Sequence, residues 1–231
     1  MHTELSLAQN IARAFTQLFN IKLHFLCVYG SHVKPSCGIH ASTVSSCIAS
    51  AMFKLAMGEI DGPLYVADVH GRPVCRCSGG RTWLGLESQF EPSLSEQMVM
   101  KHLKVDVKTA DETYRSVGRI RPIGSHVVIS RCEDIHEDPE VKCIVCFAEA
   151  SKIRDICGVV HFQAREFLGQ IRVPWGPSCA TLVTYPAGMA ECAPQDCVFL
   201  GPTDPSAKEW LPEGYLALGI PIEIARMITK C

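Results

Sequence analysis

Apolar residues recur along the chain with two different spacings. In residues 4–19 they return every three or four positions, which predicts a helix with Leu7, Ile11, Phe15 and Leu18 on one face. Elsewhere, short runs of β-branched and aromatic residues predict strands. Further helices are expected at 42–57, at 151–167, at 222–230 and directly after Pro177, and another is capped by Ser93 or Ser95 and runs through 97–103. Strands are expected at 21–29, 63–68, 126–131, 141–147, 198–200 and 215–220.

These helices and strands are intermixed over the whole length, so we expect one α/β domain that covers residues 1–231. Its architecture would be α+β, a mixed sheet with flanking helices. Residues 1–38 are expected to form a helix–strand extension of the same domain. The sequence shows no internal repeat, and 231 residues of which 47% are hydrophobic suffice for one sizeable core.

Charge and hydropathy exclude several partners. The formal net charge is only -2 and both signs are interspersed, which argues against nucleic acid. The longest apolar stretches, such as 143–148, are far shorter than the ~18 residues of a membrane span. The N-terminal residues do not have the pattern of a signal peptide, so a cytoplasmic location is expected. This composition allows a homodimer but does not require one.

Thirteen cysteines are many for such a protein. A disulfide scaffold would be shorter and would usually have an even number of cysteines. Metal binding or redox chemistry is therefore the better explanation for some of these thiols, and the others can be small buried hydrophobes.

Cys75 and Cys77 lie in a predicted loop bounded by glycine and proline. Two thiols separated by one residue in a loop can reach the same metal centre. Gly79 and Gly80 follow them, and glycine would let the backbone approach a bulky sulfur-ligated group.

Cys179 follows Gly176 and Pro177, and proline favours the first turn of a helix. A thiolate near the positive end of that helix would be stabilised. Gly176 would again allow close approach of a bound group. Cys47 is placed in the middle of the helix predicted at 42–57, where a core thiol and a ligand are equally plausible.

The remaining cysteines are weaker candidates. Cys143 and Cys146 form a C-x-x-C pair inside a predicted strand, where residues three apart point to opposite faces, so they are expected to be core. The same interpretation applies to Cys27, Cys132 and Cys157. Cys37, Cys192 and Cys197 lie in turn-like segments and stay open as ligands. No histidine spacing indicates a zinc enzyme, and no nucleotide-binding motif is present.

Several short motifs stand out along the chain: Cys77-Ser-Gly-Gly-x-x-x-Leu-Gly, Gly176-x-x-Cys179-Ala, Cys47 upstream of Ala56-Met57-Gly58, Val198-Phe-Leu-Gly201 and Leu218-Gly-Ile-Pro221. In these motifs the chain resembles the domain of unknown function 169 family, a group of archaeal and bacterial cysteine-containing proteins. The resemblance spans most of the chain from about residue 40. It implies that Cys47, Cys77 and Cys179 form a functional cluster, but no activity. Cys75, Cys132, Cys192 and Cys197 depart from the family pattern, which leaves a fourth ligand undecided.

These observations favour an iron–sulfur protein with a [4Fe–4S] cluster. Cys47, Cys77 and Cys179 would be ligands, with Cys75 or Cys37 as the fourth, and one iron could stay open. Its partner would be a redox protein or a small molecule. The alternatives are a structural or regulatory zinc protein, a metal-free thiol enzyme with Cys179 as nucleophile, and a binding module with packed cysteines.

Overall fold

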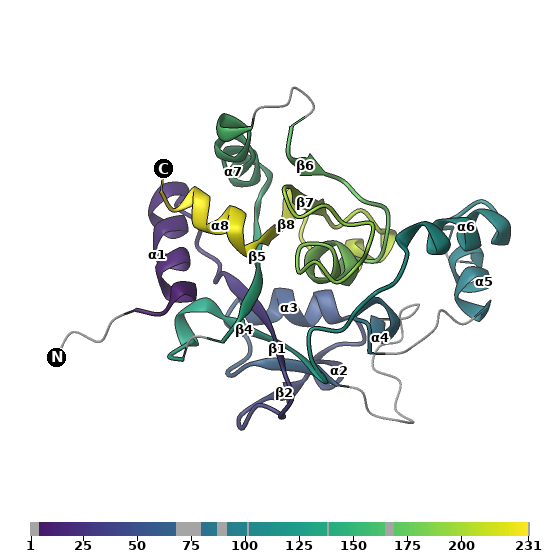
Figure 1. Cartoon of the computed structure of the whole chain (residues 1–231), viewed down its shortest axis with the longest axis horizontal. Coiled ribbons are helices and arrows are strands. Elements are labelled where there is room, and N and C mark those ends of the chain that lie inside the picture. The colour runs from purple at the N-terminus through teal and green to yellow at the C-terminus, as the bar shows by residue number, and fades with distance from the viewer. Residues whose placement is uncertain are drawn as a thin grey trace.

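An eight-stranded mixed sheet runs through the centre of the molecule (Figure 1). The computed structural model describes residues 5–67, 80–86, 92–100, 102–137, 139–164 and 169–230. The strands are β1 (Leu26–Ser31), β2 (Ile39–His40), β3 (Leu64–Ala67), β4 (His126–Arg131), β5 (Val141–Glu149), β6 (Ile171–Arg172), β7 (Val198–Gly201) and β8 (Tyr215–Pro221).

The strands follow the order β2-β3-β4-β1-β5-β8-β7-β6. Neighbours in the middle are antiparallel, whereas the edge strands β2 and β6 are parallel to β3 and β7. All six strands expected from the sequence are present. β2 and β6 were not predicted because two residues are too few to establish an alternating pattern. The expected single α/β domain with a mixed sheet is confirmed, and β1 lies at its centre.

Helices cover both faces of the sheet. On one face lie α1 (Leu7–Phe19), α7 (Ala150–Gln163) and α8 (Ile222–Ile228), which Figure 1 shows around one end of the sheet. On the other lie α3 (Ile48–Ala56), α4 (Gly80–Trp83), α5 (Pro92–Met100), α6 (Val107–Val117) and the π-helix η2 (Ala180–Thr184). Two short 3-10 helices, η1 (Cys132–Asp134) and η3 (Pro205–Glu209), complete the helical elements described.

Several helices differ from the sequence-based predictions. The helix expected at 42–57 is broken into α2 (Ala41–Val44) and α3. The helix expected at 97–103 is α5, which begins earlier, and α6 was missed. Leu18 was expected on the buried face of α1 but is 47% exposed, because Phe19 points inward in its place.

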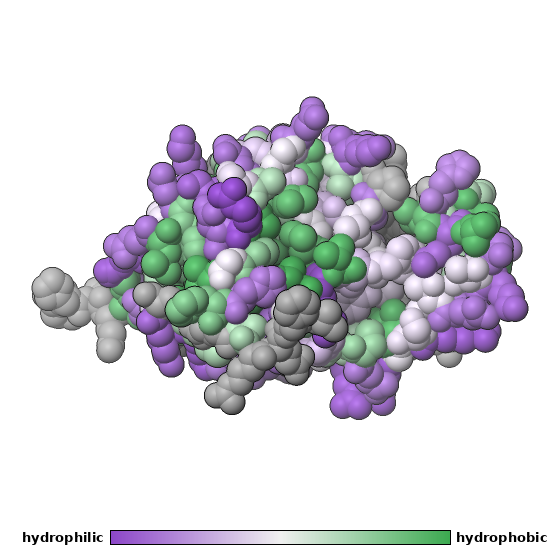
Figure 2. Space-filling view, turned by 90° about the horizontal axis from the view of Figure 1, so that it is seen from above, coloured by the Kyte–Doolittle hydropathy of each residue, from purple (hydrophilic) through white to green (hydrophobic). Residues whose placement is uncertain are grey.

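The exposed surface carries no broad apolar belt on the face shown in Figure 2, where hydrophobic residues are scattered among hydrophilic ones. Within the part of the chain that the structure describes, no helix combines the length and the apolar character needed to cross a membrane.

The sheet consists of two halves with the same topology. The order β2-β3-β4-β1 in the first half matches β6-β7-β8-β5 in the second. In each half a two-residue edge strand is parallel to a four-residue strand, and the other pairings are antiparallel. The halves meet at the antiparallel pair β1–β5, as two copies related by a twofold axis normal to the sheet would do. The structure thus reveals a repeated topology that the sequence alone did not.

Candidate functional site

Cys179 lies at the start of an unusual helical turn. It is the N-cap of η2, in which the Tyr185 N–H donates to the Ala180 carbonyl at 3.0 Å, a bond that spans five residues. Such π-turns are rare and frequently occur at functional sites. The helix expected after Pro177 is therefore present but short, which reduces the dipole available to stabilise a thiolate. Cys179 is only 3% exposed.

The turn that carries Cys179 is fixed by an acidic residue from another loop. The Ser178 N–H donates to the Asp204 carboxylate at 2.8 Å, and the Ser178 hydroxyl donates to the same oxygen. Ser178 is buried. Because a carboxylate accepts both bonds, this contact belongs to the stronger, charge-assisted class.

Tyr185 directly follows η2, and its side chain contacts the loop that precedes Cys179. Its hydroxyl donates to the Trp175 carbonyl at 3.4 Å. Burial, together with the nearby thiols of Cys192 and Cys179, raises the pKa of Tyr185. Gly176 has a φ of 149°, and a Cβ there would lie 3.3 Å from the Tyr185 hydroxyl. In the structure the small size of Gly176 thus lets the loop approach Tyr185, while its expected contact with a cofactor stays a prediction.

Aromatic rings form a wall beside this turn. The Trp83 ring lies 5.6 Å from that of Tyr114 and 6.5 Å from that of Tyr185. Trp175 extends the wall, 6.4 Å from Tyr114, and Lys104 lies 4.2 Å above its ring. The wall joins α4, α6 and η2, and its rings exclude water from that side of the Cys179 turn.

α4 packs against the turn that carries Cys179. The Thr184 hydroxyl donates to the Trp83 carbonyl, so η2 and α4 are bonded to each other. Gly80 is buried and begins α4. Cys75, Cys77 and Gly79, which the sequence predicts as ligands and loop glycine, lie outside the described residues.

Cys47 is the N-cap of α3, not a residue in the middle of a helix as predicted. The Cys47 N–H donates to the Ser45 hydroxyl at 3.2 Å. Serine side chains that bond to nearby backbone in this way compete with helical hydrogen bonding, and the chain leaves the helical conformation at Ser45. Cys47 is partly buried and packs against the core on the same sheet face as Cys179.

Cys47 and Cys179 occupy equivalent places in the two halves of the fold. Each lies seven residues after its edge strand, from His40 to Cys47 and from Arg172 to Cys179, and each directly precedes α3 or η2, with Cys47 in an extended and Cys179 in a helical conformation. An alignment without gaps of residues 39–57 with residues 171–189 makes these identities: Ile39 with Ile171, Ser46 with Ser178, Cys47 with Cys179, and Met57 with Met189. The Ser-Cys pair is thus repeated at the same structural position.

The other described cysteines separate into core and loop residues. Cys143 and Cys146 contribute to opposite faces of the sheet, as predicted for a strand, and Cys27 and Cys132 are buried. Cys37 and Cys192 are exposed. Cys197 is buried, its thiol donates to the Pro194 carbonyl at 3.7 Å, and burial raises its pKa to about 11. Cys157 is half-buried on α7.

Across the described ranges, no three side chains among histidine, cysteine, aspartate and glutamate come together in a way that could hold a metal ion. A complete set of ligands would have to include residues outside those ranges, where Cys75 and Cys77 lie.

Sequence analysis missed three residues that build the site: Tyr185, Asp204 and Trp83. Tyr185 and Trp175 flank Gly176 and Cys179 in the sequence, and this aromatic pair was the available signal. Asp204 and Trp83 come from other segments, and only the fold brings them to the turn.

Comparison with known proteins gives one match. The model of the domain of unknown function 169 family, described as Uncharacterised ArCR, matches residues 14–230. No curated protein and no solved structure matches the chain.

Proposed function

The chain belongs to the domain of unknown function 169 family, and we propose that it holds an iron–sulfur cluster on cysteine thiolates. Cys47 and Cys179 are the ligands that the described residues contribute. Cys77 is the third, and Cys75 is our choice for the fourth. With three strong candidates, one iron could remain open to a substrate or a non-cysteine ligand.

The observation that carries this proposal is the repeated Ser-Cys pair. Of the ten described cysteines, only Cys47 and Cys179 occupy equivalent positions in the two halves of the fold, seven residues after an edge strand. Equivalent positions are expected for two ligands of one shared centre. Both also pack against the same core, on the face of the sheet that carries α4.

The available donors fit a thiolate-bound centre. Cys47 and Cys179 offer sulfur in apolar surroundings, and sulfur ligands select iron–sulfur clusters or zinc over magnesium and calcium. Within the described ranges, no carboxylate or imidazole completes a group with them. When bound, the cluster supplies single-electron transfer or, at an open iron, Lewis-acid chemistry.

The surrounding residues would position the ligands and exclude water. Asp204 holds Ser178 and thereby the turn that ends in Cys179. The rings of Trp83 and Tyr185 cover the adjacent side. A redox protein or a small molecule would be the partner, and the reducing cytoplasm is the compartment in which unpaired thiols persist.

The test is purification without oxygen, followed by a visible spectrum and determination of iron, zinc and acid-labile sulfide. We expect a broad band near ~400 nm and about four irons and four sulfides per chain. In Cys47→Ala and in Cys179→Ala the band and most of the iron should be lost.

Cys146→Ala is the matched control, because Cys146 is equally a buried cysteine but lies on the opposite face of the sheet. It should retain the band. Colourless wild-type protein with one zinc per chain would replace the cluster by a structural zinc site, and full retention of iron in Cys179→Ala would remove Cys179 from the ligand set.

A further inference from the structure

A cavity of about 700 Å³ lies beside α1, between this helix and the segment that leads into β1. This volume is typical of small-molecule sites. We call it the α1 groove; its lining includes Ala12, Arg13, Gln17, Lys22, Leu23 and Phe25. It belongs to the α1 side of the molecule, whereas Cys47 and Cys179 pack against the core on the other face of the sheet.

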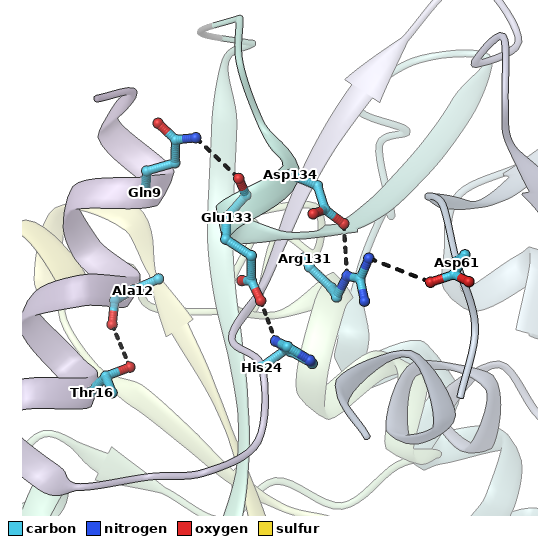
Figure 3. A network of polar contacts seen from close by, with 8 residues as sticks. All are labelled: Gln9, Ala12, Thr16, His24, Asp61, Arg131, Glu133 and Asp134. Atoms are coloured by element: carbon cyan, nitrogen blue, oxygen red, sulfur yellow. Dashed lines mark hydrogen bonds and ion pairs between the residues drawn. The ribbon is translucent and has the colours of Figure 1, made fainter. Parts of the chain in front are cut away.

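Acidic groups at one end of the groove already have partners. Glu133 lines the groove and forms an ion pair with His24, and its backbone carbonyl accepts a hydrogen bond from the Gln9 amide at 3.0 Å (Figure 3). Beside it, Arg131 pairs with Asp134 at 2.7 Å and with Asp61 at 3.8 Å. Of these carboxylates, only that of Glu133 lines the groove, and it is already bound by His24.

The basic groups in the groove are not balanced in this way. Arg13 and Lys22 both line it, and neither forms an ion pair or a side-chain hydrogen bond with any described residue. The Gln17 side chain likewise has no hydrogen-bond partner within the described ranges. The groove thus offers two positive charges and an amide that are available to a ligand.

The floor of the groove is apolar. Ala12, Ile21 and Phe25 are buried and contribute to it, and Leu23 is partly exposed. A ligand that contacts both the basic side chains and the apolar floor must carry an anionic head for Arg13 and Lys22 and an apolar body for the floor. We propose that the α1 groove binds such an amphiphilic organic anion, a carboxylate or phosphate attached to a hydrocarbon body.

Decanoate, a monocarboxylate with a hydrocarbon chain, is the probe. Isothermal titration calorimetry on the full chain should show saturable binding at one site. Arg13→Gln/Lys22→Gln should weaken it by at least about tenfold, because the variant lacks both positive charges that would contact the anionic head. Lys108→Gln/Arg115→Gln removes two exposed cations from α6 and should leave binding unchanged.

Two further titrations separate specific binding from adsorption to apolar surface. Decyltrimethylammonium carries a similar hydrocarbon chain but the opposite charge, and it should not compete with decanoate. Thr16→Trp places a large ring at an exposed position of the groove wall and should block binding. Absence of saturable binding, equal affinity in Arg13→Gln/Lys22→Gln, or full competition by the cation would each overturn the proposal. None of these readouts depends on a bound metal.

Discussion

Individual buried thiols and phenols make the free energy of unfolding of this protein depend on pH. Burial raises the pKa of Cys146, and burial also raises the pKa of Tyr185. A group of this kind binds its proton more tightly in the folded state than in the unfolded chain. Its stabilising contribution is complete below the unfolded pKa and is lost as the pH rises toward the folded value.

We therefore expect the free energy of unfolding to fall above about pH 9, the ordinary thiol pKa. Each buried thiol adds up to about 1.4 kcal/mol per pH unit to this fall. Cys146→Ala should make the decline shallower by that amount, as measured by urea unfolding at pH 7, 9 and 10. An unchanged slope in Cys146→Ala would show that this thiol does not contribute.

Among the elements, η2 packs closely against the strand β8. A Cβ at Gly219 of β8 would lie 2.8 Å from the Thr181 carbonyl oxygen and 2.6 Å from a Pro186 side-chain carbon. Gly158, within α7, has no atom within 4 Å of the position of a Cβ. The two glycines form a matched pair for substitution by alanine.

Gly219→Ala should push η2 away from the sheet and destabilise the protein by about 1–3 kcal/mol, the usual cost of overpacking. Gly158→Ala should be neutral or stabilising by up to about 1 kcal/mol, because alanine favours a helix interior. Urea unfolding of both variants measures the difference. Equal stabilities would contradict the packing described for η2.

Sequence patterns predicted the long elements well and the site less well. β5 and β8 are apolar runs with sharp ends, so their strands were found. The break before α3 was missed, because the Ser45 hydroxyl bond to the Cys47 N–H competes with the helix and leaves no trace in hydrophobic spacing. α6 buries only Ala110, Tyr114 and Val117, and its otherwise polar segment resembled an exposed loop. Cys47 and Cys179 were chosen from the sequence, but their equivalence needs the strand order.

For the molecule as a whole, the two halves of the sheet are joined by a short connection and by the β1–β5 pair. Leu26 pairs with Val145, and Val28 with Cys143. Both hydrophobic cores contain residues from each half. Neither half can bury its apolar surface alone, but together they have all the contacts of the intact chain.

Fragments 1–137 and 138–231 should therefore copurify when expressed together, and each should be insoluble when expressed alone. Ile144→Pro in the second fragment should abolish association, because proline removes a backbone donor from the central strand β5. Copurification with a single affinity tag measures this. Fragments that fold separately, or an Ile144→Pro fragment that still associates, would refute the dependence on β1–β5 pairing.

The matching halves also indicate how the chain arose. A gene that encoded one four-stranded half would have produced a symmetric homodimer, with one Ser-Cys turn in each subunit. Two halves in one chain are free of the requirement to remain identical. In this chain α4, α5 and α6 lie between the third and fourth strands of one half, and α7 follows the first strand of the other, while Cys47 and Cys179 lie at equivalent places in both.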